Sequence, residues 1–291
     1  MQGGLGNQLF QYATAYSYAK KYKRKIIINL DSYAGYQWNK DAGFVINKII
    51  KDLIISKPTF WTIFFKNEKY LKILNKIIKK MFWLKGQVFI EKKGFSFDPQ
   101  LFENDNWDGM IGFFQSSKYF ESFEKDIIKI FQFPIQSSNI IKYKKLIENS
   151  DCPVSIHYRD YGHLHSGNEQ IKKEFGDISI EYYNKAMEKI NKTNKKSTYF
   201  IFSNSIKSAK EKFADLNNVI FVDFKSEYEW EDLVLMSLCH HNIICNSSYS
   251  WWSAYLNEYT NKMVIAPKNW GEKLSNSQNN NDLFLKEWIL I

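Results

Sequence analysis

Hydrophobic and polar residues alternate along the second half of this chain in blocks that predict strands and helices in turn. Short apolar runs typical of buried strands are followed by segments with apolar residues at helical spacing. Strands are expected at 153–158, 198–203, 219–222, 242–245 and 263–266, and helices at 179–191, 205–213, 229–239 and 251–257. This alternation predicts an α/β fold, with a mostly parallel sheet and helices on both faces.

The first half of the chain shows the same pattern less clearly. A glycine-rich loop, Gly3–Asn7, precedes a helix expected at Gln8–Tyr22 and a strand expected at Lys25–Leu30. In doubly wound folds a strand normally precedes such a loop, so we expect the first strand of this domain to be missing. Further along, Gly109–Gln115 is expected to be strand-like and Ser116–Phe133 mainly helical.

A change of pattern near residue 136 predicts a domain boundary. Phe133-Pro134 and the polar Ser137-Ser138-Asn139 precede the clear alternation. The predicted domains are therefore 1–136 and 137–291. Within the first, the lysine-rich segment Lys66–Lys85 carries an apolar stripe, which predicts a solvated helix packed on one face. The alternative is a helix that lies on an anionic membrane surface.

Composition narrows the classes of protein. The chain is 44% hydrophobic and 17% aromatic, which is enough to build sizeable cores and excludes disorder as the main state. Its three cysteines lack metal-type spacing and are expected to be buried, reduced thiols. We find neither a signal peptide at the start nor an apolar run long enough to span a bilayer, so we expect a cytoplasmic location.

Charge leaves several partners open. The formal net charge of +9 fits nucleic acid, an anionic membrane surface or an acidic small molecule. However, Arg24 and Arg159 are the only arginines, and lysine lacks the fork-shaped donors that read bases. We therefore expect no nucleic-acid partner.

Polar side chains follow three of the predicted strands, where parallel α/β sheets bind their ligands. A polar loop between a strand and a helix can bind an anion, because backbone N–H groups and the helix dipole point at it and hydroxyls add donors. The alternative for the loop after residue 245 is plain capping of the next helix. The three clusters are His157-Tyr158-Arg159-Asp160, Ser203-Asn204-Ser205 and Asn246-Ser247-Ser248-Tyr249-Ser250.

His157 and Arg159 alternate along a strand end and are expected to point to the same face. An arginine can hold two phosphate oxygens in a planar fork. His157 or Asp160 could orient or deprotonate a sugar hydroxyl. The structural alternative is a surface pair between Arg159 and Asp160 beside a histidine whose hydrogen bonds are satisfied.

Metal chemistry is not indicated. His163 and His165 are two residues apart and His240 and His241 are adjacent, and neither spacing matches a zinc site. There is no Asp-x-Asp of the kind that holds a divalent ion on a nucleotide diphosphate. We expect neither a metal nor another cofactor.

Several motifs together resemble glycosyltransferase family 11, the α-1,2-fucosyltransferases. The first is Gln2-Gly-Gly-Leu-Gly-Asn-Gln-Leu-Phe-Gln-Tyr-Ala13, and the second is Gly112-Phe-Phe-Gln-Ser-Ser-Lys-Tyr-Phe120. The segment Met236–Asn257 is similar to the most specific family motif nearly residue for residue, and Val264–Trp270 resembles the strand and turn that follow it. Taken together, the motifs span essentially the whole chain.

The resemblance implies a GT-B-like fold, with two Rossmann-type domains facing a cleft, and an inverting enzyme without a metal. The donor would be GDP-β-L-fucose, bound mainly by the second domain. The acceptor would be the 2-hydroxyl of a galactose-type residue, in a galactoside or lipid-linked oligosaccharide, on the side of the first domain. Peripheral contact with the inner face of the membrane would suit a lipid-linked acceptor. Catalytic roles would fall to Arg159, His157 and Asp160, and donor binding to Gly4, Gly6, Asn7, Ser203, Asn246, Ser247, Ser248 and Ser250.

One motif departs from the family pattern. The family has His-x-Arg-Arg-x-Asp-Tyr, whereas this chain has His157-Tyr158-Arg159-Asp160-Tyr161, without a second arginine. Two alternatives therefore stay open beside an α-1,2-fucosyltransferase. The first is a catalytically impaired relative that binds nucleotide or glycan, and the second is a transferase that uses another nucleotide sugar.

Overall fold

The architecture was determined from a computed structural model, which describes residues 1–30, 43–56, 87–92, 94–135, 137–161, 178–193, 196–270 and 282–291. The chain forms two compact units. The first comprises Met1–Gln132 with Asn281–Phe284, and the second comprises Phe133–Asn280 with Leu285–Ile291. The predicted helix at Lys66–Lys85 and the pair His163 and His165 lie outside the described residues.

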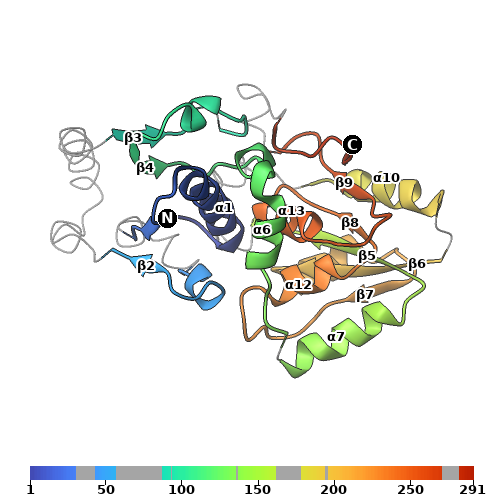
Figure 1. The fold of residues 1–291 in the computed structure, drawn as a ribbon. Helices are drawn as coiled ribbons and strands as arrows, with labels where there is room; N and C mark the ends of the chain where they lie inside the picture. The colour runs from blue at the N-terminus through green and yellow to red at the C-terminus, as the bar shows by residue number, and fades with distance from the viewer. Residues whose placement is uncertain are drawn as a thin grey trace, which may run out of the picture. The chain divides into compact units, whose positions relative to one another are not determined.

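In the first unit, a long helix lies beside two parallel strand pairs (Figure 1). The helix α1 spans Leu5–Tyr22. It begins three residues earlier than expected, because Gly4 is the N-cap residue, so Gly6 and Asn7 belong to its first turn. Strand β1 (Ile27–Ile28) pairs with β2 (Ile54–Ile55), and β3 (Gln87–Ile90) pairs with β4 (Trp107–Ile111).

Short helices complete the first unit, at Ile46–Lys48 (η1), Pro99–Phe102 (η2), Ser117–Tyr119 (η3), Glu121–Phe123 (η4) and Glu124–Ile130 (α6). Aromatic rings fill its core, among them the fully buried Phe10 and Phe120. Asp282 joins the end of the chain to this unit. Its carboxylate accepts a hydrogen bond from the Phe97 N–H at 2.8 Å and pairs with the Lys118 ammonium group. These contacts hold Asp282 in the first unit.

The second unit is built on a six-stranded parallel sheet (Figure 1), with the order β7-β6-β5-β8-β9-β10. Its strands are β5 (Cys152–Tyr158), β6 (Ser197–Ser203), β7 (Val219–Phe221), β8 (His241–Ile243), β9 (Val264–Ala266) and β10 (Ile289–Leu290). Its helices are α7 (Ser138–Glu148), α10 (Ile180–Asn191), α11 (Ile206–Lys212), α12 (Glu231–Ser237) and α13 (Ser248–Tyr255). The α/β fold class with a parallel sheet is therefore confirmed.

Local sequence signals account for these elements. All seven residues of β5 are buried, as expected for the central strand of a parallel sheet that is covered on both faces. Helix α10 begins after Ser179, whose Oγ accepts the Tyr182 N–H and so caps the helix. The sheet also carries a core of alternating residues, such as Val154 and Ile156 of β5, packed with the α10 residues Tyr183 and Ile190.

A buried polar network holds the opposite face of the sheet to α12 and α13. The Asn242 side chain donates to Ser155 Oγ at 2.7 Å and to the Met236 carbonyl at 2.8 Å, and its oxygen accepts from Asn257 Nδ2 at 2.7 Å. Asn257 also donates to the Cys239 carbonyl at 2.8 Å. Several polar residues of the Met236–Asn257 motif therefore fix the helices on the sheet instead of facing a ligand.

The order of the strands contains one reversal. From β5 the chain proceeds outward through β6 and β7, and then returns to place β8 on the other side of β5, followed by β9 and β10. This is the doubly wound Rossmann order, in which ligands bind beyond the carboxyl ends of the two strands at the reversal. A ligand site is therefore expected among the residues that follow Tyr158 and Ile243.

Candidate functional site

Two side-chain contacts connect the ends of β5 and β8. The Arg159 guanidinium donates from one of its terminal nitrogens to Ser247 Oγ at 3.1 Å. Two residues earlier on both segments, His157 Nδ1 lies 3.1 Å from Cys245 Sγ. The strands are parallel neighbours, so residues two apart on each form successive contacts on the same side. The structure thus brings together side chains that are 88 positions apart in the sequence.

Arg159 has donors that the described protein does not use. Its Nε is buried, and no described residue accepts a hydrogen bond from it. The Tyr161 ring, whose centroid lies 5.3 Å from Arg159 Cζ, holds the guanidinium from one side. Tyr161 is itself fixed by a 2.8 Å hydrogen bond from its hydroxyl to the Asn246 carbonyl. A half-buried cation with open donors is suited to bind an anion.

The His157 imidazole, unlike the Arg159 guanidinium, is held in its neutral form. Its side chain is only 7% exposed, and burial together with the nearby Arg159 charge lowers the pKa of its imidazole to about 3. The ring is therefore neutral at physiological pH. A base with so low a pKa takes a proton poorly, which weighs against His157 as the group that deprotonates an acceptor hydroxyl.

The loop between β8 and α13 serves two purposes. Ser247 is the N-cap residue of α13, and its Oγ accepts the Tyr249 N–H at 3.3 Å while it also contacts Arg159. The helix thus begins at Ser248 and not at Trp251, because the serines form its first turn. Capping and ligand binding, posed as alternatives for this loop, are compatible at Ser247.

The other polar residues expected at the site differ in their surroundings. Ser250 is fully buried and donates its hydroxyl hydrogen to the Ser247 carbonyl at 3.2 Å, so it supports the loop from inside. Ser203 forms a local turn, in which its Oγ accepts the Ser205 N–H at 3.1 Å and contacts the Ser205 carbonyl. Asn246 is 3% exposed and Ser248 is half-buried at the start of the helix.

Two neighbouring segments support the loop after β5. The backbone of Asp160 exchanges two hydrogen bonds with the Asn204 side chain, at 2.8 Å from its N–H and 2.9 Å to its carbonyl. Asn204, in the cluster after β6, is thus a supporting residue whose role the sequence did not reveal.

Asp232 is a further residue that sequence reasoning missed. Burial, with a smaller contribution from the Glu231 charge, raises the pKa of its carboxyl to about 7. Burial first, and then the Asp232 charge, raises the pKa of the Tyr249 hydroxyl. The Tyr249 ring centroid lies 6.0 Å from that of His157. A perturbed carboxyl beside the switch point is typical of functional sites. The only sequence signal was its position at the start of a helix, which ordinarily indicates capping or dipole effects.

The glycine-rich loop of the first unit is built differently. Gly3 has a positive φ of 80°, and a Cβ there would lie 2.6 Å from Asn7 Nδ2, so only glycine fits. The fully buried Gln8 donates to the carbonyls of Gly3 and Gly43 and accepts the N–H groups of Val45 and Ile46, at 2.8–3.1 Å. All four hydrogen-bonding positions of this amide are therefore used to hold the loop.

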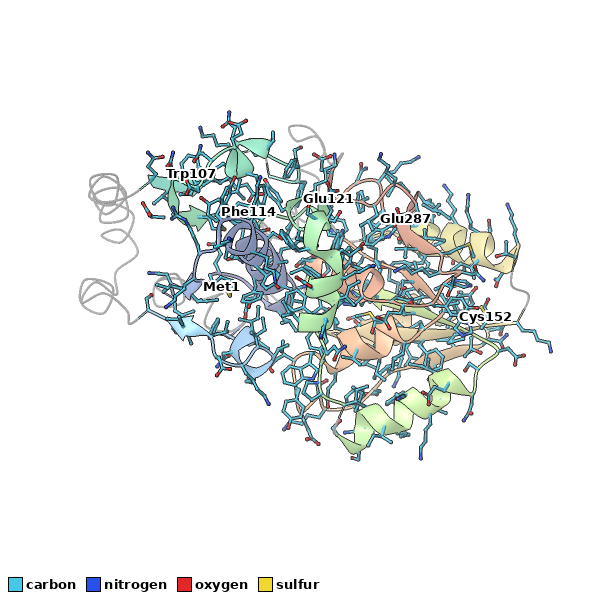
Figure 2. All side chains as sticks on the ribbon, viewed as in Figure 1. Met1, Trp107, Phe114, Glu121, Cys152 and Glu287 are labelled. Atoms are coloured by element: carbon cyan, nitrogen blue, oxygen red, sulfur yellow. The ribbon has the colours of Figure 1, made fainter. Side chains whose placement is uncertain are left out.

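Asn7 is joined to the second family-like motif. Its Oδ1 accepts a hydrogen bond from Gln115 Nε2 at 2.6 Å. Phe114, labelled in Figure 2, precedes Gln115 with a positive φ of 53°, which is unusual for a bulky residue. The Glu91 carboxylate holds this backbone by accepting the N–H groups of Phe113 at 2.7 Å and Phe114 at 3.0 Å. Glu91 is thus a second residue that the sequence did not single out.

Within the described parts of the chain, no group of three or more His, Cys, Asp or Glu side chains could hold a metal ion. Over the same residues, no helix is long and apolar enough to cross a membrane.

The strand order defines a Rossmann-type α/β protein, with the Arg159 cation at the reversal of that order. The profile of Glycosyl transferase family 11 matches residues 1–291, and the chain belongs to that family. It is therefore a glycosyltransferase.

Two relatives from Escherichia coli match along nearly their whole length. The O-antigen biosynthesis glycosyltransferase WbnK is 29% identical over 310 residues, which cover 99% of this chain and 98% of that protein. An alpha-1,2-colitosyltransferase is 27% identical over 316 residues, with 100% and 97% covered. Among solved structures, the NodZ alpha-1,6-fucosyltransferase soaked with GDP-fucose is 15% identical, with a TM-score of 0.48 over 88% of this chain and 90% of that one.

Proposed function

We propose that this glycosyltransferase moves L-fucose from GDP-β-L-fucose, with inversion, to the 2-hydroxyl of a galactose-type residue in a surface glycan such as an O-antigen. The single observation that supports this most is Arg159 at the β5–β8 switch point, held by Ser247 and Tyr161 but with open donors. Diphosphate is the part of a nucleotide sugar that such a group binds. Family membership and the O-antigen relative supply the reaction class and the acceptor class.

Arg159 would act on the leaving group. As the bond between sugar C1 and the β-phosphate breaks, negative charge grows on the diphosphate, and a fixed cation lowers the energy of that state. Ser247, Ser248 and the N-terminal backbone of α13 would add donors. These groups would neutralise the diphosphate without a divalent ion, so we propose that activity survives a metal chelator.

Asp160 would take the proton of the acceptor hydroxyl. Of the two candidate bases, His157 is held neutral with a pKa of about 3, while the Asp160 carboxylate follows the same strand end. Asp160 is kept in place through its backbone, which exchanges two hydrogen bonds with the Asn204 side chain.

A second candidate donor has its own support. One relative is named for colitosyl transfer in α-1,2 linkage, so a different deoxysugar donor would fit the same diphosphate site. Because the Arg159 contacts engage the diphosphate and not the sugar, they favour neither donor over the other.

The test is a transfer assay with purified protein. GDP-fucose and nucleotide-linked colitose would each be offered with a panel of β-galactosides, free and lipid-linked, and the linkage of any product would be mapped. Fucose on the 2-hydroxyl supports the proposal, and product from colitose alone supports the second candidate. GDP binding by calorimetry with neither transfer nor donor hydrolysis would instead indicate an impaired relative.

A further inference from the structure

Cys245 contacts the imidazole ring of His157. Its side chain is fully buried, and its Sγ is 3.1 Å from His157 Nδ1. Ser250 Oγ also lies near this sulfur, at 3.9 Å. No described residue makes a hydrogen bond to the other ring nitrogen of His157, Nε2. One side of the imidazole is thus engaged by the protein, and the other is open to a ligand.

The direction of the hydrogen bond follows from the neighbours of the sulfur. Ser250 already donates its hydrogen to the Ser247 carbonyl, so it can only accept from Cys245, and at 3.9 Å it does so weakly. The imidazole nitrogen is closer and is a good acceptor for a thiol. The short contact is therefore best satisfied by S–H donation to Nδ1.

Protonation states agree with this geometry. Burial raises the pKa of the Cys245 thiol to about 12, although the Arg159 charge opposes the rise. Burial first, and then the Arg159 charge, lowers the pKa of His157 to about 3. The proton thus stays on sulfur and the ring stays neutral, which excludes a thiolate–imidazolium pair.

We propose that Cys245 is a positioning residue that keeps His157 in the Nε2–H form, so that His157 offers a hydrogen-bond donor and not a base to the bound nucleotide sugar. The proposal rests on the proposed function only in placing the nucleotide sugar beside His157. The matching ligand group is an acceptor, either a phosphate or carbonyl oxygen or a ring nitrogen. His157 and Arg159, two residues apart, would then offer their donors on the same side of the strand end. These donors are the Nε2–H of His157 and the guanidinium of Arg159.

The tautomer can be read directly from the ligand-free protein. Protein with ¹⁵N-labelled histidine would be examined by long-range ¹H–¹⁵N correlation, and the His157 signals identified by their loss in His157→Gln. We expect the Nε2–H pattern, unchanged between about pH 5 and about pH 8. A proton on Nδ1 in the wild-type protein would overturn the proposal.

Substitutions at Cys245 separate the donor from simple packing. Cys245→Ala removes the donor, and we expect the Nδ1–H form to appear and GDP affinity by calorimetry to fall about tenfold. Cys245→Ser keeps a donor and should retain the wild-type tautomer and affinity within about twofold. Cys239→Ala is the matched control, because Cys239 is equally buried in the same unit but its Sγ contacts the Leu235 carbonyl.

The outcomes distinguish this proposal from the proposed function. An unchanged tautomer in Cys245→Ala, or an equal loss of affinity in Cys239→Ala, would contradict a positioning role. If GDP fails to bind the wild-type protein, the nucleotide-sugar function is wrong, while the spectra of the free protein still decide the tautomer.

Discussion

Helices α1 and α13 each begin after a short polar loop, yet the polar side chains around the two helix starts are used in opposite ways. In the first unit, Gln8 uses every hydrogen-bonding position on the backbone of its own unit, and Asn7 accepts from Gln115. In the second unit, Arg159 contacts Ser247 but keeps a buried Nε that no described residue engages.

This difference separates a shape-giving loop from a ligand-binding loop. A satisfied amide network fixes a backbone and has little left for a ligand. A desolvated cation with open donors is costly until an anion arrives, and such groups are typical of functional sites. Both loops are polar and rich in small residues, glycine in one and serine in the other. Composition alone therefore does not distinguish a loop that fixes the backbone from one that binds a ligand.

The largest expected effect comes from Arg159→Ala. Because it removes the cation that would stabilise the leaving diphosphate, kcat for fucose transfer should fall on the order of 10³-fold, about 4 kcal/mol in the barrier. Arg159→Lys should recover little, since lysine lacks the fork. Arg24→Ala, at the other arginine, should leave kcat unchanged. Steady-state kinetics with all three variants would test this, and a kcat for Arg159→Ala near the wild-type value would remove Arg159 from the mechanism.

Gln8→Leu tests the first unit, with a large effect on stability. The change leaves four backbone groups, three of them in buried residues, without their partner, so the free energy of unfolding should fall by about 3 kcal/mol. Denaturant unfolding would measure it, with Gln100→Leu as control because that side chain is exposed. A loss of activity without a loss of stability would mean that this loop, too, is chiefly a ligand site.

Asp232 makes the stability of the second unit depend on pH. Its pKa is about 7 in the folded protein against 3.8 normally, so between these values the folded state holds a proton that the unfolded state releases. Stability from this group is present at low pH and is lost as pH rises toward 7. We expect a decrease of about 1–2 kcal/mol from about pH 5 to about pH 7 in wild-type protein and a flatter profile in Asp232→Asn. Equal slopes in urea unfolding would show that Asp232 is ionised throughout.

Ser203→Ala should have the smallest effect of these changes. Its Oγ bonds only within the local turn at Ser205, at the end of β6 and away from the β5–β8 reversal. We expect GDP affinity to change by less than about twofold and stability by about 1 kcal/mol at most. Ser247→Ala, measured alongside by calorimetry, should weaken GDP binding more. The reverse ranking would place the ligand nearer β6.

Much of the second unit could be predicted from its residues alone. Each predicted strand is present to within two residues, because a buried parallel strand needs a short apolar run and a turn signal at either end. Helix starts were less exact. The helix expected at 179–191 begins at Ile180, whereas α1 and α13 begin three residues earlier than expected, since glycine or serine continues as readily into a first turn as into a loop.

The candidate site could be predicted only in part. Arg159, His157 and Ser247 were identified as residue types at strand ends and are brought together, but the inward direction of Ser250 and the perturbed carboxyl of Asp232 have no local signal. Burial and pKa depend on what packs around a side chain, and those neighbours come from distant parts of the chain.

The sequence by itself determined the family, the alternation of strands and helices, and the polar residues at strand ends, because these depend on local pattern and on motifs. Only the tertiary structure decided which strand ends meet. The return of the chain from β7 to the other side of β5 places Arg159 beside Ser247 and His157 beside Cys245. That order is set by the packing of helices on both faces of the sheet, a long-range property that no single segment encodes.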